Sequence, residues 1–272
     1  MSLLLLVLPI LILLYLLAIM PGMLGRPDTT PFQGWLYAHR GLHENGTAAP
    51  ENSLEAFRRA VDAGFGIELD IQLSKDGVVV VFHDDTLKRV CGVEGSVCDY
   101  TYDELLRLKL CGTKERIPRL EEVLQLVAGK VPLIVELKLP TKDISLCPIA
   151  DELLSAYQGV YCVESFNPLG LMWYRRHRSA VVRGQLADSF SKEKSHKGCL
   201  YFALQHLLFN FLTKPDFVAY HHKYPRALSR RICQRLYKCL AVAWTIRSRE
   251  EMEQAKGAFD LFIFEGFLPE QP

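Results

Sequence analysis

Short apolar runs alternate with amphipathic segments along the chain after residue 31. The apolar runs are four to eight residues long, and many are bounded by Gly, Pro, Asn or Asp, so we predict that they form strands. They cover residues 35–39, 66–73, 78–83, 131–137, 160–165, 181–186, 217–220, 240–246 and 261–264. The amphipathic segments predict helices over residues 52–63, 101–110, 120–128 and 248–256.

Strands that alternate with helices are typical of a mainly parallel sheet with helical crossovers. Eight or nine such strands in about 240 residues fit a closed barrel. We therefore predict an α/β fold, a TIM-type (β/α)8 barrel that forms one domain over residues 33–272. A doubly wound open sheet is the alternative. It is disfavoured because no phosphate loop of the GxGxxG or GxxxxGK type follows the first strand.

One junction interrupts the alternation, because only residues 74–77 separate the second and third predicted strands. Four residues cannot form a parallel crossover, and their Asp-Gly step is a common hairpin turn. We therefore predict one antiparallel hairpin here. Its turn places Glu68 opposite His83, to within a residue or two.

The amino-terminal residues 2–25 contain no charged side chain. A helix of this length, at about 1.5 Å per residue, would cross a hydrocarbon core of about 30 Å. We predict a single N-terminal transmembrane helix, an anchor over residues 1–25. A cleaved signal peptide is the alternative. Positive side chains begin only after the run, at Arg26 and Arg40, which favours a single-pass membrane protein with a cytoplasmic barrel.

The composition narrows the class of partner. The chain has 32 Lys+Arg and 31 Asp+Glu, a net charge of +1, which argues against nucleic-acid binding. Residues 174–249 hold 16 of the basic residues and only 3 acidic ones, either as a solvated face or as a surface toward an anion such as a membrane. The uncharged run 199–213 is either a barrel helix or a lip in a lipid interface. Eight scattered cysteines are expected to be reduced, and no obligatory protein partner is inferred.

Polar side chains gather at the carboxyl ends of the predicted strands, where barrels place their active sites. They are His39, Arg40, Glu68, Asp70, His83, Asp84, Glu136 and Lys138. Because strand side chains alternate, Glu68 and Asp70 share one face. Three carboxylates among apolar strands repel one another unless a hard cation joins them. We therefore predict a site for a phosphate ester, in which carboxylates hold a divalent ion, cations hold the phosphate and imidazoles move protons.

The same residues lie in motifs that resemble the glycerophosphodiester phosphodiesterase family. The matching strings are residues 39–41 (HRG), 50–57 (PENSLEAF), 68–70 (ELD), 83–84 (HD), 117–118 (IP) before 120–122 (LEE), 136–138 (ELK), 165–168 (SFNP) and Trp244. The resemblance implies a TIM-type barrel that cleaves glycerophosphodiesters to glycerol 3-phosphate and an alcohol. It also implies a divalent metal, calcium or magnesium, as cofactor.

The resemblance also implies a role for each site residue. His39 and His83 resemble the general acid/base pair, and the metal ligands correspond to Glu68, Asp70 and Glu136. The phosphate would be held by Arg40 and Lys138, while the substrate pocket would include Trp244 and, as a weaker candidate, Gln185. Asn52 belongs to the first loop of the site and also has the position of a helix cap.

One segment departs from the family pattern: residues 264–269 read FEGFLP, where many relatives have Thr-Asp/Asn-x-Pro. The usual insertion after the third strand is short, so an open mouth that admits a lipid-like substrate is expected. Lysophospholipase D-type cleavage of lysophospholipids at the membrane is therefore an alternative function. Two further alternatives are a catalytically silent membrane-anchored barrel and a phosphodiesterase that releases a cyclic phosphate.

Overall fold

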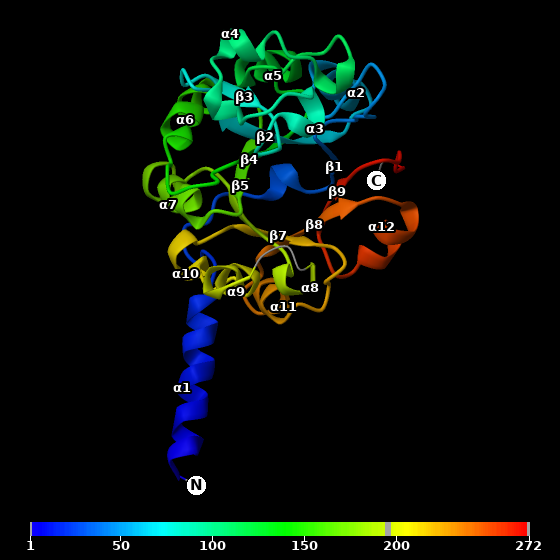
Figure 1. The fold of residues 1–272 in the computed structure, drawn as a ribbon. Coiled ribbons are helices and arrows are strands. Elements are labelled where there is room, and N and C mark those ends of the chain that lie inside the picture. The colour runs from blue at the N-terminus through cyan, green and yellow to red at the C-terminus, as the bar shows by residue number, and fades with distance from the viewer. Residues whose placement is uncertain (1, 194–196, 271–272) are drawn as a thin grey trace.

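The computed structural model describes residues 2–193 and 197–270. Within them, eight parallel strands close into the predicted TIM-type barrel, with helices on its outside (Figure 1). The barrel strands are β1 Leu36–His39, β2 Gly66–Leu73, β4 Leu133–Leu137, β5 Tyr161–Ser165, β6 Arg183–Ala187, β7 Phe217–His221, β8 Leu240–Ile246 and β9 Leu261–Phe264. β1 pairs with both β2 and β9, which closes the ring.

Alternation along each strand divides the core into two parts. The outward residues, such as Ile67 and Leu69, join the large apolar cluster beneath the helices. The inward residues form a second apolar cluster, which includes Tyr37 and Phe217 and is joined by Phe32 from the 3-10 turn η1 (Thr30–Phe32). The Tyr37 hydroxyl donates to the Phe32 carbonyl at 2.9 Å. This apolar floor leaves the polar inward residues at the carboxyl ends of the strands.

The helices outside the barrel are α2 Leu54–Asp62, α5 Leu120–Val127, α6 Leu146–Ala156, α7 Pro168–His177, α9 Cys199–Gln205, α10 Asn210–Thr213, α11 Leu228–Arg235 and α12 Arg249–Ala255. Short turns of helix are α3 Lys88–Cys91, α4 Tyr102–Leu105 and α8 Phe190–Glu193, with 3-10 turns η2 Val97–Asp99 and η3 Leu110–Gly112. The predicted helix over residues 101–110 is thus only α4. The apolar run 199–213 divides into α9 and α10, because Leu207 between them has a φ of 57°.

β3 Val79–Val81 pairs antiparallel with the end of β2, and Ile71 lies opposite Val81. Continued by two residues, this register places Leu69 opposite His83, one residue from the predicted Glu68. The difference arises in the turn, where the Ser74 N–H donates to the Val78 carbonyl and centres the turn on Asp76. β3 and the residues that follow it form a small apolar cluster of their own, made of Val80, Phe82, Leu87, Val90, Val97, Leu105, Leu110 and Ile117.

The predicted transmembrane helix over residues 1–25 is not found. α1 runs over Ser2–Ala18, 17 residues, and it projects from the barrel (Figure 1). Pro21 follows its end, and the residue before a proline is pushed out of the helical region. Among the helices of the residues that the structure describes, none is both long and apolar enough to cross a membrane. The base of α1 is fixed to the barrel wall: the Tyr15 and Ser229 hydroxyls lie 2.9 Å apart, and the Asn210 amide donates to the Ile19 carbonyl.

Candidate active site

The carboxyl ends of the barrel strands surround a cavity of about 390 Å³. It is lined by His39, Arg40, Glu68, His83, Glu136, Lys138, Glu164, Phe166, Leu186, Asp188, Glu193, His221, Trp244, Thr245, Arg247 and Ile263. The structure therefore brings seven of the nine predicted site residues to one cavity. Of the other two, Asp70 is fully buried and contacts Arg40 and Lys138 from this group, whereas Gln185 lies apart.

Glu68, Asp70 and Glu136 each offer an oxygen to one point, since these atoms lie within 4.8 Å of one another. β2 and β4 are in register at Asp70 and Glu136, which sets these two carboxylates side by side. Burial, and then the neighbouring Asp70 carboxylate, raises the pKa of Glu68 well above its usual value. Burial also raises the pKa of Glu136. Such a set of mutually repelling oxygens fits a hard divalent cation such as Mg²⁺ or Ca²⁺.

Two cations adjoin these carboxylates. The Lys138 ammonium lies 3.0 Å from Asp70 Oδ1 and 2.8 Å from Glu136 Oε1, and these carboxylates outweigh burial and keep the pKa of Lys138 above its usual value. The Arg40 guanidinium lies 3.4 Å from Asp70 Oδ2. Although burial opposes it, the charges of Lys138, His83 and Arg40 hold the pKa of Asp70 well below its usual range.

Glycine is required after Arg40, because Gly41 has a φ of 82° and a Cβ there would lie 2.9 Å from the Ala56 backbone. This close approach brings the start of α2 beneath the site. Asn52, which has a φ of 55°, donates from Nδ2 to Asp70 Oδ2 at 2.9 Å. It is not the helix cap that its position suggested, since the Ser53 hydroxyl accepts from the Ala56 N–H and caps α2.

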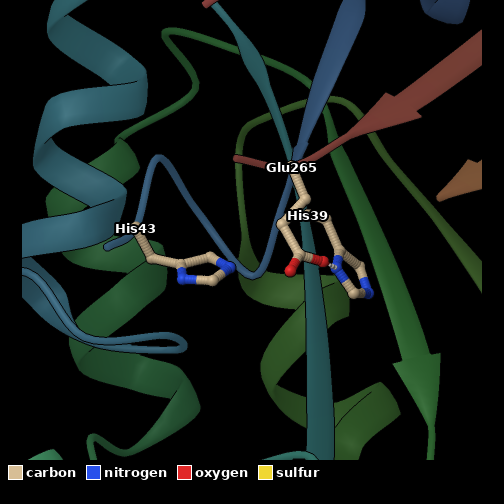
Figure 2. A group of neighbouring side chains, drawn as sticks. All are labelled: His39, His43 and Glu265. Carbon is tan, nitrogen blue, oxygen red and sulfur yellow. Dashed lines mark hydrogen bonds and ion pairs between the residues drawn. The ribbon is translucent and has the colours of Figure 1, made fainter. Parts of the chain in front are cut away.

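His39 is held by a carboxylate that follows β9. Its Nδ1 lies 2.6 Å from Glu265 Oε2, while its Nε2 lies 3.9 Å from Glu68 Oε2. Burial and the Arg40 charge lower the pKa of His39 to about 4, against the opposing effect of Glu265. The imidazole is therefore neutral at pH 7. Figure 2 shows the Glu265 carboxylate between His39 and His43, and these three residues form a second group within 4.8 Å.

His83 is held in the same way by the residue after it, since its Nδ1 lies 2.7 Å from Asp84 Oδ1. Arg89 from α3 donates to both Asp84 oxygens, at 2.6 and 2.8 Å, and to both Glu51 oxygens at 2.7 Å. Glu51, which is only 4% exposed, also accepts from Arg40 at 2.7 Å. Arg89 thus links the His83 side of the cavity to the Arg40 side.

Glu164, Glu265 and Arg89 were not predicted as site residues. Glu164 is in register with Glu136, is 1% exposed, and its Oε2 has no hydrogen-bond partner among the described residues. Burial and the Glu136 and Asp70 charges raise the pKa of Glu164 well above its usual value. Both acids could have been found from the inward rows, because Glu164 comes two residues after Cys162 and Glu265 two after Ile263.

Of the two substrate-binding residues predicted on the later strands, Trp244 lies at the cavity and Gln185 does not. Trp244 lines the cavity, with its ring 5.7 Å from that of Phe166 in an edge-to-face arrangement. Gln185 does not line it: the side chain is 1% exposed and donates to the carbonyls of Ser165, Phe166 and Leu186. It joins β5 to β6 instead.

Comparison with known proteins agrees with this site. The profile of the glycerophosphoryl diester phosphodiesterase family matches residues 39–259, well over half of the chain. The chain belongs to this family. It is 40% identical over 150 residues to the glycerophosphodiester phosphodiesterase of Caldanaerobacter subterraneus subsp. tengcongensis, which covers 49% of this chain and 58% of that protein. It is also 41% identical over 111 residues to the Bacillus altitudinis enzyme of the same name, a match that covers 38% of this chain and 44% of that protein. The matched part thus spans about half the length of these curated relatives.

The fold is shared with solved structures. An Oleispira antarctica phosphodiesterase, in complex with its product sn-glycerol-3-phosphate, superposes with a TM-score of 0.70 at 23% identity. The match covers 86% of this chain and 93% of that one. At this identity the likeness is evidence of the barrel alone.

Proposed function

We propose that this protein hydrolyses glycerophosphodiesters to glycerol 3-phosphate and an alcohol in a reaction that depends on a divalent cation. One observation carries the proposal: Glu68 and Glu136 line one cavity together with two imidazoles, each imidazole is held by its own carboxylate, and buried Asp70 converges with Glu68 and Glu136. Family membership supports it. The cation would be held by Glu68, Asp70 and Glu136, and when bound it would supply positive charge to the phosphate oxygens.

The histidines are arranged for proton transfer at Nε2. Because Nδ1 of His39 donates to Glu265 and Nδ1 of His83 donates to Asp84, each ring keeps Nε2 free for the substrate. One imidazole takes the proton of the attacking water as its oxygen bonds to phosphorus. The other, which must be protonated at Nε2 as an imidazolium, gives that proton to the alcohol oxygen as the bond from that oxygen to phosphorus breaks. Arg40 and Lys138 line the same cavity and hold phosphate oxygens.

The direct test is product analysis on purified protein with glycerophosphocholine, glycerophosphoethanolamine and glycerophosphoglycerol. We expect glycerol 3-phosphate with Mg²⁺ or Ca²⁺ and no turnover in strong chelator. His39→Ala and His83→Ala should each lower kcat by at least about 100-fold. His177→Ala, an exposed histidine of α7, is the matched control and should keep full activity. Turnover that survives chelation, or near-normal turnover in either variant, would refute the proposal. A cyclic phosphate seen by phosphorus NMR would assign the attack to a substrate hydroxyl instead of water.

We also propose that the protein works at a lipid surface, where lysophospholipids join its substrates. Leu200 and Phe202 of α9 are 55% and 60% exposed, and α9 contacts α8, whose Glu193 lines the cavity. Apolar side chains so placed would contact the acyl chain of a lysophospholipid. The cytoplasmic side of the membrane stays a prediction from the charges after residue 25.

An assay that compares lysophosphatidylcholine with glycerophosphocholine tests this second proposal. The double variant Leu200→Ser/Phe202→Ser should lower the ratio of their kcat/KM values by at least about fivefold, because the acyl chain loses its apolar contacts. Leu106→Ser, which changes a leucine that is 44% exposed near α4, is the matched control. No turnover of the lysophospholipid by the wild-type protein would exclude it as a substrate.

A further inference from the structure

A second group of side chains that can bind a metal lies beside the converging carboxylates. His39, His43 and Glu265 each offer one atom, and these atoms lie within 4.8 Å of one another (Figure 2). The donors are two imidazole nitrogens and one carboxylate oxygen, whereas the first group offers oxygens alone. Zn²⁺ and similar transition-metal ions bind such mixed donors well, while Mg²⁺ and Ca²⁺ prefer oxygens. The two groups therefore suit different ions.

His43 has no hydrogen-bond partner for its ring. Nδ1 and Nε2 are both buried, and neither forms a hydrogen bond within residues 2–193 and 197–270. Burial lowers the pKa of His43, so the ring is neutral at pH 7 and one nitrogen keeps a lone pair. Figure 2 shows this ring directed at the Glu265 carboxylate. Buried polar atoms without a protein partner call for another one, and an ion would supply it here.

The backbone holds the three side chains in place. His39 ends β1, and the turn after it is closed by the His43 N–H, which donates to the Gly41 carbonyl at 2.9 Å. Glu265 follows β9, where its N–H donates to the Ile246 carbonyl at 2.9 Å. The side chains of His39 and Glu265 are 13% and 24% exposed, so an ion can enter from solvent. Donors on ordered backbone need little rearrangement to bind it.

The positive side chains nearby are engaged with carboxylates. Arg40 and Arg89 both form ion pairs with buried Glu51. Arg247 lies 3.3 Å from Glu265, but it is 54% exposed, so its guanidinium can turn toward water when an ion takes its place. The Glu265 carboxylate is thus the negative charge that is available to a cation at this group.

We propose that His39, His43 and Glu265 form a binding site for Zn²⁺ or a similar transition-metal ion, and that this ion inhibits the enzyme. The His39 nitrogen that faces Glu265 is Nδ1, so the ion takes its lone pair and the ring proton moves from Nδ1 to Nε2. A neutral ring with its proton at Nε2 cannot accept a proton there, and it is a far weaker acid than an imidazolium. Binding needs only these three residues, but the inhibition rests on the proposed function, in which His39 transfers a proton at Nε2.

Inhibition by Zn²⁺ in the presence of excess Mg²⁺ tests the proposal. Hydrolysis of glycerophosphocholine is followed as Zn²⁺ is added, and each variant is compared with its own rate without Zn²⁺. We expect wild type to be inhibited, with no relief from more Mg²⁺. His43→Phe keeps a flat ring without nitrogens and should raise the half-inhibiting Zn²⁺ concentration by at least about 100-fold, because loss of a residue that only supports a ligand already costs about 10–100-fold in affinity. His177→Ala, which removes an exposed histidine of α7, is the control and should keep the wild-type sensitivity.

Calorimetric titration with Zn²⁺ in the same excess of Mg²⁺ gives a readout that does not depend on turnover. Wild type should bind an ion that His43→Phe does not bind, and His177→Ala should bind it as wild type does. His43→Ala should give the same results as His43→Phe, both in calorimetry and in the inhibition assay. It therefore decides the question if the phenylalanine variant does not fold.

The outcomes separate this inference from the proposed function. Absence of Zn²⁺ binding, or binding and inhibition that both His43 variants retain, would overturn the site. Inhibition that more Mg²⁺ relieves would assign the ion to the carboxylates of Glu68, Asp70 and Glu136 instead. Binding that depends on His43 but does not inhibit would overturn the effect on His39. If wild type hydrolyses no glycerophosphodiester, the proposed function fails, and the calorimetric comparison still decides whether the ion binds here.

Discussion

Replacing Arg89 by alanine tests whether the two sides of the site are joined by charge. Arg89 is the centre of a network that runs from Arg40 through Glu51 and Asp84 to His83. In Arg89→Ala, the side-chain partners left among the described residues are Arg40 and Asn45 for Glu51, and His83 for Asp84. We expect both lower stability and lower turnover, because Asp84 and the His83 imidazole that it holds are no longer fixed in position.

The size of the stability effect follows from Glu51. Burial raises the pKa of Glu51, but its hydrogen bonds from Arg89 and the other positive groups around it lower that pKa from an ordinary 4.5 to about 2. The bonds from Arg89 are the largest of the lowering effects. Such a difference corresponds to about 3 kcal/mol at neutral pH. Solvent screens the Arg89 side chain, which is 49% exposed, and Arg40 also pairs with Glu51. The contribution of Arg89 to the free energy of unfolding is therefore about 1–2 kcal/mol. A loss of that size lowers Tm by about 2–8 °C.

The pH dependence distinguishes an ion pair from packing. Because folding depresses the pKa of Glu51, the stabilisation is complete above pH 4.5 and disappears as the pH falls toward 2. We therefore expect denaturant unfolding to show a difference between wild type and Arg89→Ala that is full at pH 7 and much smaller at pH 3. Turnover at pH 7 should fall by about tenfold or more, and Arg89→Lys should restore part of it, since a lysine keeps the charge without the fork.

Arg58→Ala is the matched control, because Arg58 is 56% exposed and its ion pair is with Glu55, one helical turn away. It should change stability by less than about 0.5 kcal/mol. An equal stability loss at pH 3 and pH 7 in Arg89→Ala would refute the electrostatic reasoning. Unchanged turnover in that variant would show that the position of Asp84 does not depend on Arg89.

Two further changes test how Glu265 holds His39 and how closely Gly41 approaches α2. Glu265→Ala leaves the partly buried Nδ1–H of His39 without its acceptor and should lower kcat by about tenfold or more with little change in KM. Glu265→Asp should keep most of the activity. Steady-state kinetics test this, and a normal kcat in the alanine variant would show that the contact is dispensable. Gly41→Ala places a Cβ 2.9 Å from the Ala56 backbone at a φ of 82°, and we expect the free energy of unfolding to fall by at least about 2 kcal/mol. In Gly46→Ala the new Cβ meets no atom within 4 Å at a φ of 89°, so this control measures the cost of the dihedral alone. Equal losses in the two variants would contradict the role given to the contact with α2.

Much of the fold and the site was predictable, because both follow from strand periodicity. The barrel, the position of β2, and the convergence of Glu68, Asp70 and Glu136 follow from apolar runs with polar ends. Long-range partners were not predictable from spacing: Arg89 meets Glu51 across 38 residues, and Glu265 meets His39 across 226. The extent of α1 depended on where Pro21 ends the helix, which apolar composition alone does not reveal.

The small apolar cluster after β3 has a consequence for how activity is lost. His83 and Arg89 belong to residues 78–117, whose interior is built largely from its own side chains, while His39 is fixed between β1 and β9 of the barrel itself. The two histidines for which we propose proton transfer therefore lie in parts of the chain with separate apolar cores, and such parts can differ in local stability. We expect heat or denaturant to open residues 78–117 before the ring of strands, in which case activity would be lost before the barrel unfolds.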